Sequence, residues 1–128
     1  MLPDRARNLL APYFPELDLD RVRIKDGLPW YVPMRVAAYT DRYSIYFARG
    51  AYNPDSLKGL ALIAHELAHC AQYKRHGTWR FRVMYLWSSL VNLLRLPSFA
   101  HAYLHNRFEV AARVIARRVR DDLSNQFK

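Results

Sequence analysis

The chain lacks the features that mark disulfide-rich, secreted or membrane-spanning proteins. Its single cysteine, Cys70, excludes an intramolecular disulfide framework, and we expect it to be a small core residue. The first residues do not have the basic-then-apolar layout of a secretory signal. The uncharged run at residues 83–94 is shorter than the about 20 apolar residues that a transmembrane helix needs. We therefore expect a cytoplasmic protein without a membrane span.

Acidic residues are also scarce: the chain has 11 of them and 20 lysines and arginines, so its net charge is +9. Such a charge favours anionic partners, either nucleic acid or an acidic membrane surface. Much of the excess lies in Arg113, Arg117, Arg118 and Arg120, with no aromatic residues interleaved as in a platform for stacked bases. We therefore favour a solvated helix face over either anionic partner.

The apolar content indicates one folded domain over residues 1–128, because 52% of the chain is hydrophobic and 14% is aromatic. The patterns predict an α+β fold: a short antiparallel sheet of about three strands, packed on one central helix, with two further helices. The strands are expected at residues 19–25, 36–39 and 43–48, with a turn at 40–42. A short helix is expected near residues 4–10, and longer ones at 56–76, 79–96 and 106–123.

Two of these elements bear on function. We expect the strand residues Ser44, Ile45, Tyr46 and Phe47 to form an edge that aligns an extended peptide by strand addition, although a purely structural hairpin fits equally well. The helix at 79–96 is apolar on most sides and is expected to be buried. Its aromatic residues Trp79, Tyr85 and Trp87 keep an interfacial position as the alternative.

The central helix contains a His-Glu-x-x-His motif at residues 65–69. Histidines four residues apart point the same way on a helix, so His65 and His69 can bind one Zn²⁺ ion. Glu66 lies beside that face, where a carboxylate can take a proton from the water on the metal. The motif therefore predicts a zinc site with Glu66 as its catalytic residue.

A catalytic zinc site with two histidines needs a third protein ligand and an open position for water. Glu109 is the first candidate, because it lies on the apolar stripe of the helix at 106–123, where an unpaired carboxylate is costly. A simple ion pair with Arg113 is the alternative. His101 and His105 remain possible ligands, whereas His76 is expected to face solvent at a helix end.

The motif followed by a glutamate on a later helix resembles the gluzincin metallopeptidases, in which both histidines and that glutamate bind zinc and the motif glutamate is the general base. Residues 45–55, residues 62–69 and Gln72 are similar to small zincin-like domains related to the core domain of extracellular contractile injection system proteins. The likeness covers about residues 22–77, with a weaker echo at 107–109. It implies a minimal zincin-like domain, in which substrate selection rests on a partner protein.

The leading hypothesis is thus a zinc metallopeptidase in which Glu66 is the base and His65, His69 and Glu109 bind the metal. The group that stabilises the oxyanion is expected among Tyr103, His101 and His105. One alternative is a zinc-containing binding module or toxin-like effector without turnover. Another is a basic protease acting on nucleic-acid-bound proteins, as in SprT-like zincins, which typically use a third histidine soon after the motif.

Overall fold

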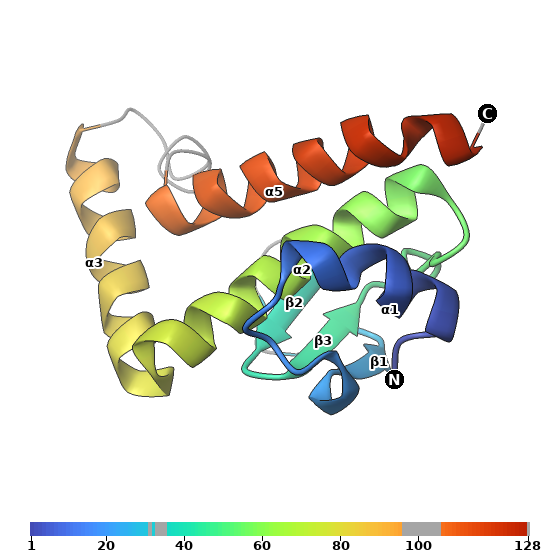
Figure 1. The fold of residues 1–128 in the computed structure, drawn as a ribbon. Coiled ribbons are helices and arrows are strands. Elements are labelled where there is room, and N and C mark those ends of the chain that lie inside the picture. The colour runs from blue at the N-terminus through green and yellow to red at the C-terminus, as the bar shows by residue number, and fades with distance from the viewer. Residues whose placement is uncertain (31, 33–35, 96–105, 128) are drawn as a thin grey trace.

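The computed structural model describes residues 1–128 except 31, 33–35, 96–105 and 128 (Figure 1). It confirms the α+β class. The chain runs through α1 (Asp4–Leu10), β1 (Arg23–Asp26), β2 (Ala38–Asp41), β3 (Ser44–Phe47), α2 (Leu57–His76), α3 (Thr78–Arg95) and α5 (Arg107–Leu123), with short 3-10 turns between and after them.

The helix α2 is the centre of the fold. Figure 1 shows it between the sheet and α5, with α1 beside it, while α3 stands across one end of the α2–α5 pair. The main core forms where α1, the sheet, α2 and α5 meet, because each contributes apolar side chains to the same cluster. Its largest fully buried members include Leu10, Ile45, Phe47, Leu60, Ile63, Leu67 and Val119.

The sheet is mixed, so the prediction of an antiparallel sheet is wrong. β3 pairs with β1 in parallel and with β2 antiparallel, which gives the order β1-β3-β2. The edge position predicted for Ser44, Ile45, Tyr46 and Phe47 is wrong as well, because this strand is central and both sides of its backbone are already paired. Of the described strands, β2 is the edge that packs against α2.

Strand starts and turns are also shifted from the predicted positions. Leu19–Arg21 forms a 3-10 turn capped by Asp18, so β1 begins only at Arg23. Thr40 and Asp41 belong to β2, and Arg42, with φ 58°, occupies the turn that follows. The expected turn at 40–42 therefore includes Arg42 but begins too early, and a non-glycine residue in this left-handed region is uncommon.

The ends of α2 agree with the prediction. The Ser56 side chain accepts a hydrogen bond from the Gly59 amide and caps the helix, which ends before Gly77 with φ 79°. Gly59 is required by packing, because a Cβ there would lie within 1.7 Å of the Asn53 carbonyl oxygen. The segment before the helix therefore crosses closely over its first turn.

The prediction that the second long helix is buried is wrong. Phe81 is buried, but Trp79 is 77% exposed and Leu94 is 81% exposed. The prediction relied on the apolar composition of α3, which is the same for a helix inside the core and for a helix with one exposed apolar face. None of the helices in the described part of the chain is long and apolar enough to cross a membrane.

The helix α5 agrees with the prediction in its limits and its inward face. Asn106 caps it by accepting a hydrogen bond from the Phe108 amide, and Glu109, Ala112, Val119 and Leu123 are buried. The arginines on its other face, Arg117, Arg118 and Arg120, are exposed.

Candidate metal centre

Packing of α5 along α2 brings together the three side chains that the sequence analysis grouped. His65 and His69 lie one turn apart on α2, with ring centroids separated by 5.1 Å. Glu109 lies in the first turn of α5, where the helix N-terminus favours a carboxylate. Its oxygens lie 3.1 Å from His65 Nε2 and 3.0 Å from His69 Nε2.

These three residues could hold a metal ion. One possible ligand atom from each lies within 4.8 Å of the others. Zinc–ligand bonds of about 2.0–2.1 Å in a tetrahedron place neighbouring ligand atoms about 3.3 Å apart. The observed separations between imidazole nitrogens and carboxylate oxygens are close to that value. Two imidazoles and one carboxylate are also a donor set that zinc prefers.

The charges within the cluster are strongly coupled. Burial alone would raise the pKa of Glu109, but hydrogen bonds and charges from His65 and His69 hold that pKa well below its usual range. Burial alone would lower the pKa of His69, yet its hydrogen bond to Glu109 and the charge of Glu109 raise it. The buried carboxylate therefore requires positive charge beside it, either from protonated imidazole or from a cation.

Gln72 orients one of the histidines. Its Nε2 donates to the Phe108 carbonyl oxygen at 3.0 Å, which leaves its Oε1 to accept from His69 Nδ1 at 2.8 Å. The proton of the neutral imidazole is therefore held on Nδ1, and Nε2 is available as a ligand atom. Gln72 is among the residues on which the family resemblance rests, but the sequence analysis gave it no role.

The helix α3 contributes a further contact that the sequence did not reveal. The Tyr85 hydroxyl donates to Glu109 Oε1 at 3.1 Å. Asn106 donates to the Tyr85 carbonyl oxygen and to Ser89 Oγ, so the cap of α5 also anchors α3. The spacing of Tyr85 four residues after the buried Phe81 was the signal that it faces inward.

Glu66 is buried beside the two histidines, and its Oε2 accepts a hydrogen bond of 2.7 Å from Thr40 Oγ1. This contact fixes the carboxylate against β2. Thr40 was missed because residues 40–42 were expected to form a turn. Its place two residues after Ala38, in the alternation of a strand, was the available signal.

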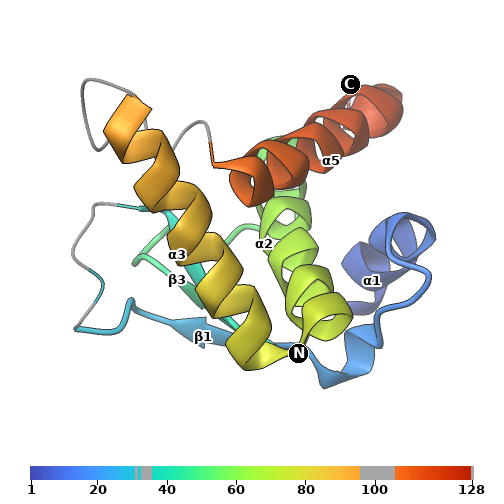
Figure 2. The ribbon, with the colours of Figure 1, turned by 90° about the vertical axis from the view of Figure 1, so that its left-hand side faces the viewer.

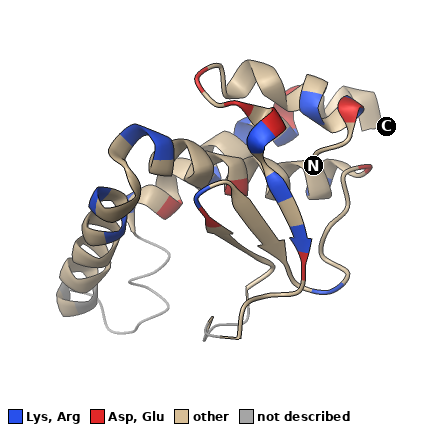
Figure 3. Ribbon diagram, turned by 90° about the horizontal axis from the view of Figure 1, so that it is seen from below, with Lys and Arg blue, Asp and Glu red and all other residues tan. Residues whose placement is uncertain are grey.

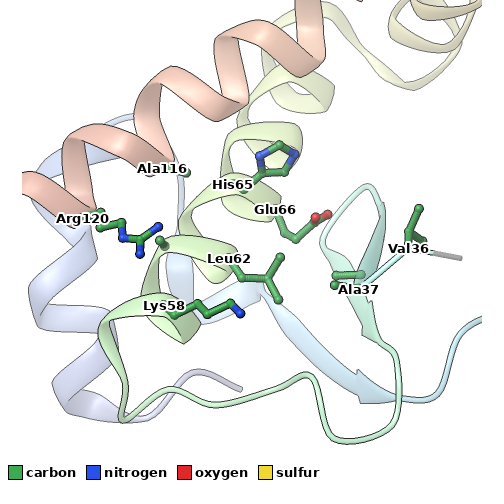
Figure 4. Close-up of a pocket in the computed structure, with 10 residues that line it drawn as sticks. Val36, Ala37, Lys58, Leu62, His65, Glu66, Ala116 and Arg120 are labelled. Carbon is green, nitrogen blue, oxygen red and sulfur yellow. The ribbon is translucent and has the colours of Figure 1, made fainter. Parts of the chain in front are cut away.

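A cleft of about 310 Å³ opens beside His65 and Glu66. Figure 4 shows Lys58 and Arg120 toward one side of it and Val36 and Ala37 toward the other. Ala38, Ala61, Leu62 and Ala116 complete the lining. The candidate base and one candidate ligand thus border a space that a ligand from solution can enter.

The other candidates have different positions. Tyr103, His101 and His105 lie outside the described residues. His76 is at the end of α2, where its ring meets the edge of Phe108, and it is not part of the cluster formed by His65, His69 and Glu109. Cys70 is buried in the core, as predicted, and burial raises the pKa of its thiol.

Comparison with known families adds one finding. The eCIS core domain model matches residues 1–77. The chain belongs to the eCIS core domain family. The eCIS core match includes the sheet and α2, and with them His65, Glu66, His69, Thr40 and Gln72. Glu109 and Tyr85 lie beyond it. No curated protein and no solved structure matches the chain.

Proposed function

We propose that the chain is a zinc metallopeptidase of the gluzincin type, with a zincin-like fold, that hydrolyses peptide bonds. The observation that carries this proposal is the convergence of His65, His69 and Glu109 next to a buried Glu66 at the wall of an open cleft. Zn²⁺ at this position would act as a Lewis acid and lower the pKa of a bound water to about 7.

The protein's own groups have separable roles in this proposal. Glu66 accepts the proton of the attacking water and passes it to the leaving amine, while Thr40 holds one of its carboxylate oxygens. Gln72 and Tyr85 keep His69 and Glu109 in position as ligands. A catalytic zinc site has three protein ligands and an open position for water, whereas a structural site is closed by a fourth ligand, and our proposal is the first of these.

The edge strand β2 replaces β3 as the strand that aligns the substrate. It pairs with β3 on one side, and Ala38 at its start lines the cleft together with Val36 and Ala37. An extended peptide that adds to the other edge of β2 would run past His65 and Glu66. Main-chain hydrogen bonds would then supply alignment, and the cleft would receive a side chain.

The cleft favours a substrate that carries a carboxylate. Lys58 and Arg120 both line it, and within the described ranges neither forms a salt bridge. Apart from His65 and Glu66, the other side chains that line the cleft are apolar. Lys58 and Arg120 are therefore the groups that can recognise a polar part of the substrate. We therefore expect an acidic residue of the substrate to lie beside Arg120.

Glu66→Gln tests the proposed function. The purified chain is expected to bind about one zinc ion and to hydrolyse unfolded casein. Glu66→Gln should keep the metal and lose about 10²–10⁴-fold in rate, because proton transfer in the transition state is removed. Glu16→Gln, an exposed substitution of the same type, should leave the rate unchanged. Full activity of Glu66→Gln, or no hydrolysis by the zinc-loaded chain, would contradict the proposal.

A further inference from the structure

The outward side of α3 carries a continuous apolar strip. Its members form two rows with a spacing of four residues, one at 79, 83 and 87 and the other at 86, 90 and 94, which places them on one face of the helix. All of them are exposed: Trp79, Val83, Leu86, Trp87, Leu90 and Leu94. Figure 2 shows α3 in front of the other described elements, with its outer side uncovered by them. An uncovered strip of large apolar side chains marks an interaction surface.

The opposite side of α3 fixes the orientation of the helix. Phe81 packs against Tyr73 and Phe108, and the Tyr85 hydroxyl reaches Glu109. Asn106 bonds to Ser89, and Arg82 forms a 2.7 Å salt bridge with Asp41 of β2. Turning the apolar strip inward would break these contacts. The strip is therefore held outward by the same side chains that support the metal centre.

The charges that α3 itself carries are positive, although Arg82 is paired with Asp41 of β2. α3 contains arginines and no acidic residue, and Figure 3 shows blue but no red along it. At its first turn, Arg75, Arg80 and Arg107 lie near His76; burial and then the charges of these arginines lower the pKa of that histidine. Arg75 is paired with Glu16, so Arg80 and Arg107 supply the positive charge at the end of the strip near Trp79. The combination matches a partner that offers an apolar layer beneath negative charge.

We propose that α3 lies on an anionic lipid surface, with its apolar strip among the acyl chains and its arginines at the headgroups. Exposed tryptophans and leucines flanked by arginines are the composition of helices that lie in the plane of a membrane. The strip from Trp79 to Leu94 is about 22 Å long at 1.5 Å per residue, so it suits an in-plane position rather than a span.

A second copy of the chain is a poorer occupant of the strip. Arg80 flanks it at a position where paired helices carry opposite charges, and among the described residues it forms no salt bridge. Arg82, on the other side, is already paired with Asp41. Two such helices side by side would bring like charges together, whereas anionic headgroups would neutralise them. A lipid surface would also keep the metal centre close to the membrane, since Tyr85 contacts Glu109 from the other side of the same helix.

Vesicle binding tests the proposal on the full chain. Equimolar phosphatidylcholine–phosphatidylglycerol vesicles should sediment with the protein, and phosphatidylcholine vesicles should not. In a Trp30→Phe background, the remaining tryptophans, Trp79 and Trp87, should shift their emission to shorter wavelength on binding. Binding should weaken as salt is raised, because the headgroup attraction is screened.

Matched variants separate the strip from net charge. Leu86→Glu should weaken binding by at least about tenfold, because it removes a large apolar side chain from the interface. Val114→Glu adds the same charge at an exposed apolar position on α5 and should weaken binding by no more than about fivefold. Arg80→Gln should weaken it by about fivefold, and Arg117→Gln, away from the strip, by less.

Three results would overturn the proposal: no sedimentation with anionic vesicles at low salt, equal losses for Leu86→Glu and Val114→Glu, or equal binding to neutral and anionic vesicles. A dimer that sedimentation velocity detects without lipid, and that Leu86→Glu dissociates, would assign the strip to a second copy instead. Circular dichroism of each variant checks that α3 is intact; both substituted side chains, Leu86 and Val114, are exposed.

Discussion

The consecutive helices α2 and α3 are similar in length, with 20 and 18 residues, yet α2 buries several polar side chains while α3 exposes many apolar ones. α2 encloses polar groups, Glu66, His69 and Gln72, each with a hydrogen-bond partner. α3 leaves tryptophans, leucines and a valine in contact with solvent. The difference shows that the position of each helix among the other elements decides which of its side chains are buried, whether these are polar or apolar.

The position of each helix explains the contrast. α2 lies between the sheet and α5, so polar groups on the sides that meet these elements must be satisfied internally. α3 meets other described elements on one side only, through Phe81, Tyr85 and Ser89. Function follows the same division, because the candidate metal centre lies on α2 and the proposed lipid contact lies on α3.

A pair of leucine substitutions tests this comparison most strongly. Leu67→Ala on α2 removes a side chain with 0% exposure and should lower the free energy of unfolding by about 2–5 kcal/mol. Leu86→Ala on α3, where the side chain is 68% exposed, should change it by no more than about 0.5 kcal/mol. Urea unfolding of both variants without lipid measures the difference. Equal losses would mean that another molecule already covers α3 in solution.

Glu109→Gln tests the polar interior between α2 and α5. Removing the only charged oxygen ligand of the described cluster should weaken zinc binding by at least about 100-fold, beyond the 10–100-fold effect typical of supporting residues. Competition with a chromophoric chelator gives the affinity, and Glu16→Gln is the matched control. Unchanged affinity would move the search for the third ligand to His101 or His105.

Gln72→Leu is expected to act more mildly on the same centre. It keeps all three candidate ligands but leaves His69 Nδ1 and the Phe108 carbonyl without their bonds to the amide. Zinc affinity should fall by about 10–100-fold, because the imidazole loses the partner that fixes its tautomer. Gln126→Leu, at an exposed site near the C-terminus, should bind zinc as the parent chain does.

The smallest expected effect concerns the cleft. Arg120→Gln should reduce kcat/KM by no more than about fivefold for a peptide that carries glutamate beside the cleaved bond, because exposed charge pairs contribute about 0.2–1 kcal/mol. The same peptide with glutamine should be unaffected. Arg117→Gln, on the same helix but outside the cleft, should spare both peptides. A loss that ignores the peptide's charge would remove Arg120 from substrate recognition.

Local patterns in the sequence predicted the helices and the clustered residues well. Ser56 and Gly77 are a cap and a stop that act within one turn, so the limits of α2 could be read directly. The four-residue spacing of His65 and His69 fixes their common direction. Glu109 stood out because a carboxylate on an apolar stripe needs a partner, and in the structure that need is met by both histidines.

Long-range relations could not be predicted in the same way. The parallel pairing of β1 with β3 joins strands that are not consecutive along the chain, and alternation along one strand contains no information about its neighbours. The predicted turn at 40–42 included Arg42 but also took in Thr40 and Asp41, which pair with β3 as the end of β2. The exposure of α3 depends on which elements reach it, which its apolar composition does not specify.

The candidate metal ligands come from two different parts of the chain. His65 lies in the eCIS core region, and Glu109, 44 residues later, lies outside it. An ion shared by the two would cross-link α2 to α5 and close a long loop, an effect comparable in kind to a disulfide of about 2–4 kcal/mol. Cys70 is the only cysteine, so the chain cannot form an intramolecular disulfide, and a bound metal would supply a cross-link of comparable effect. Chelation would then loosen the C-terminal helix first.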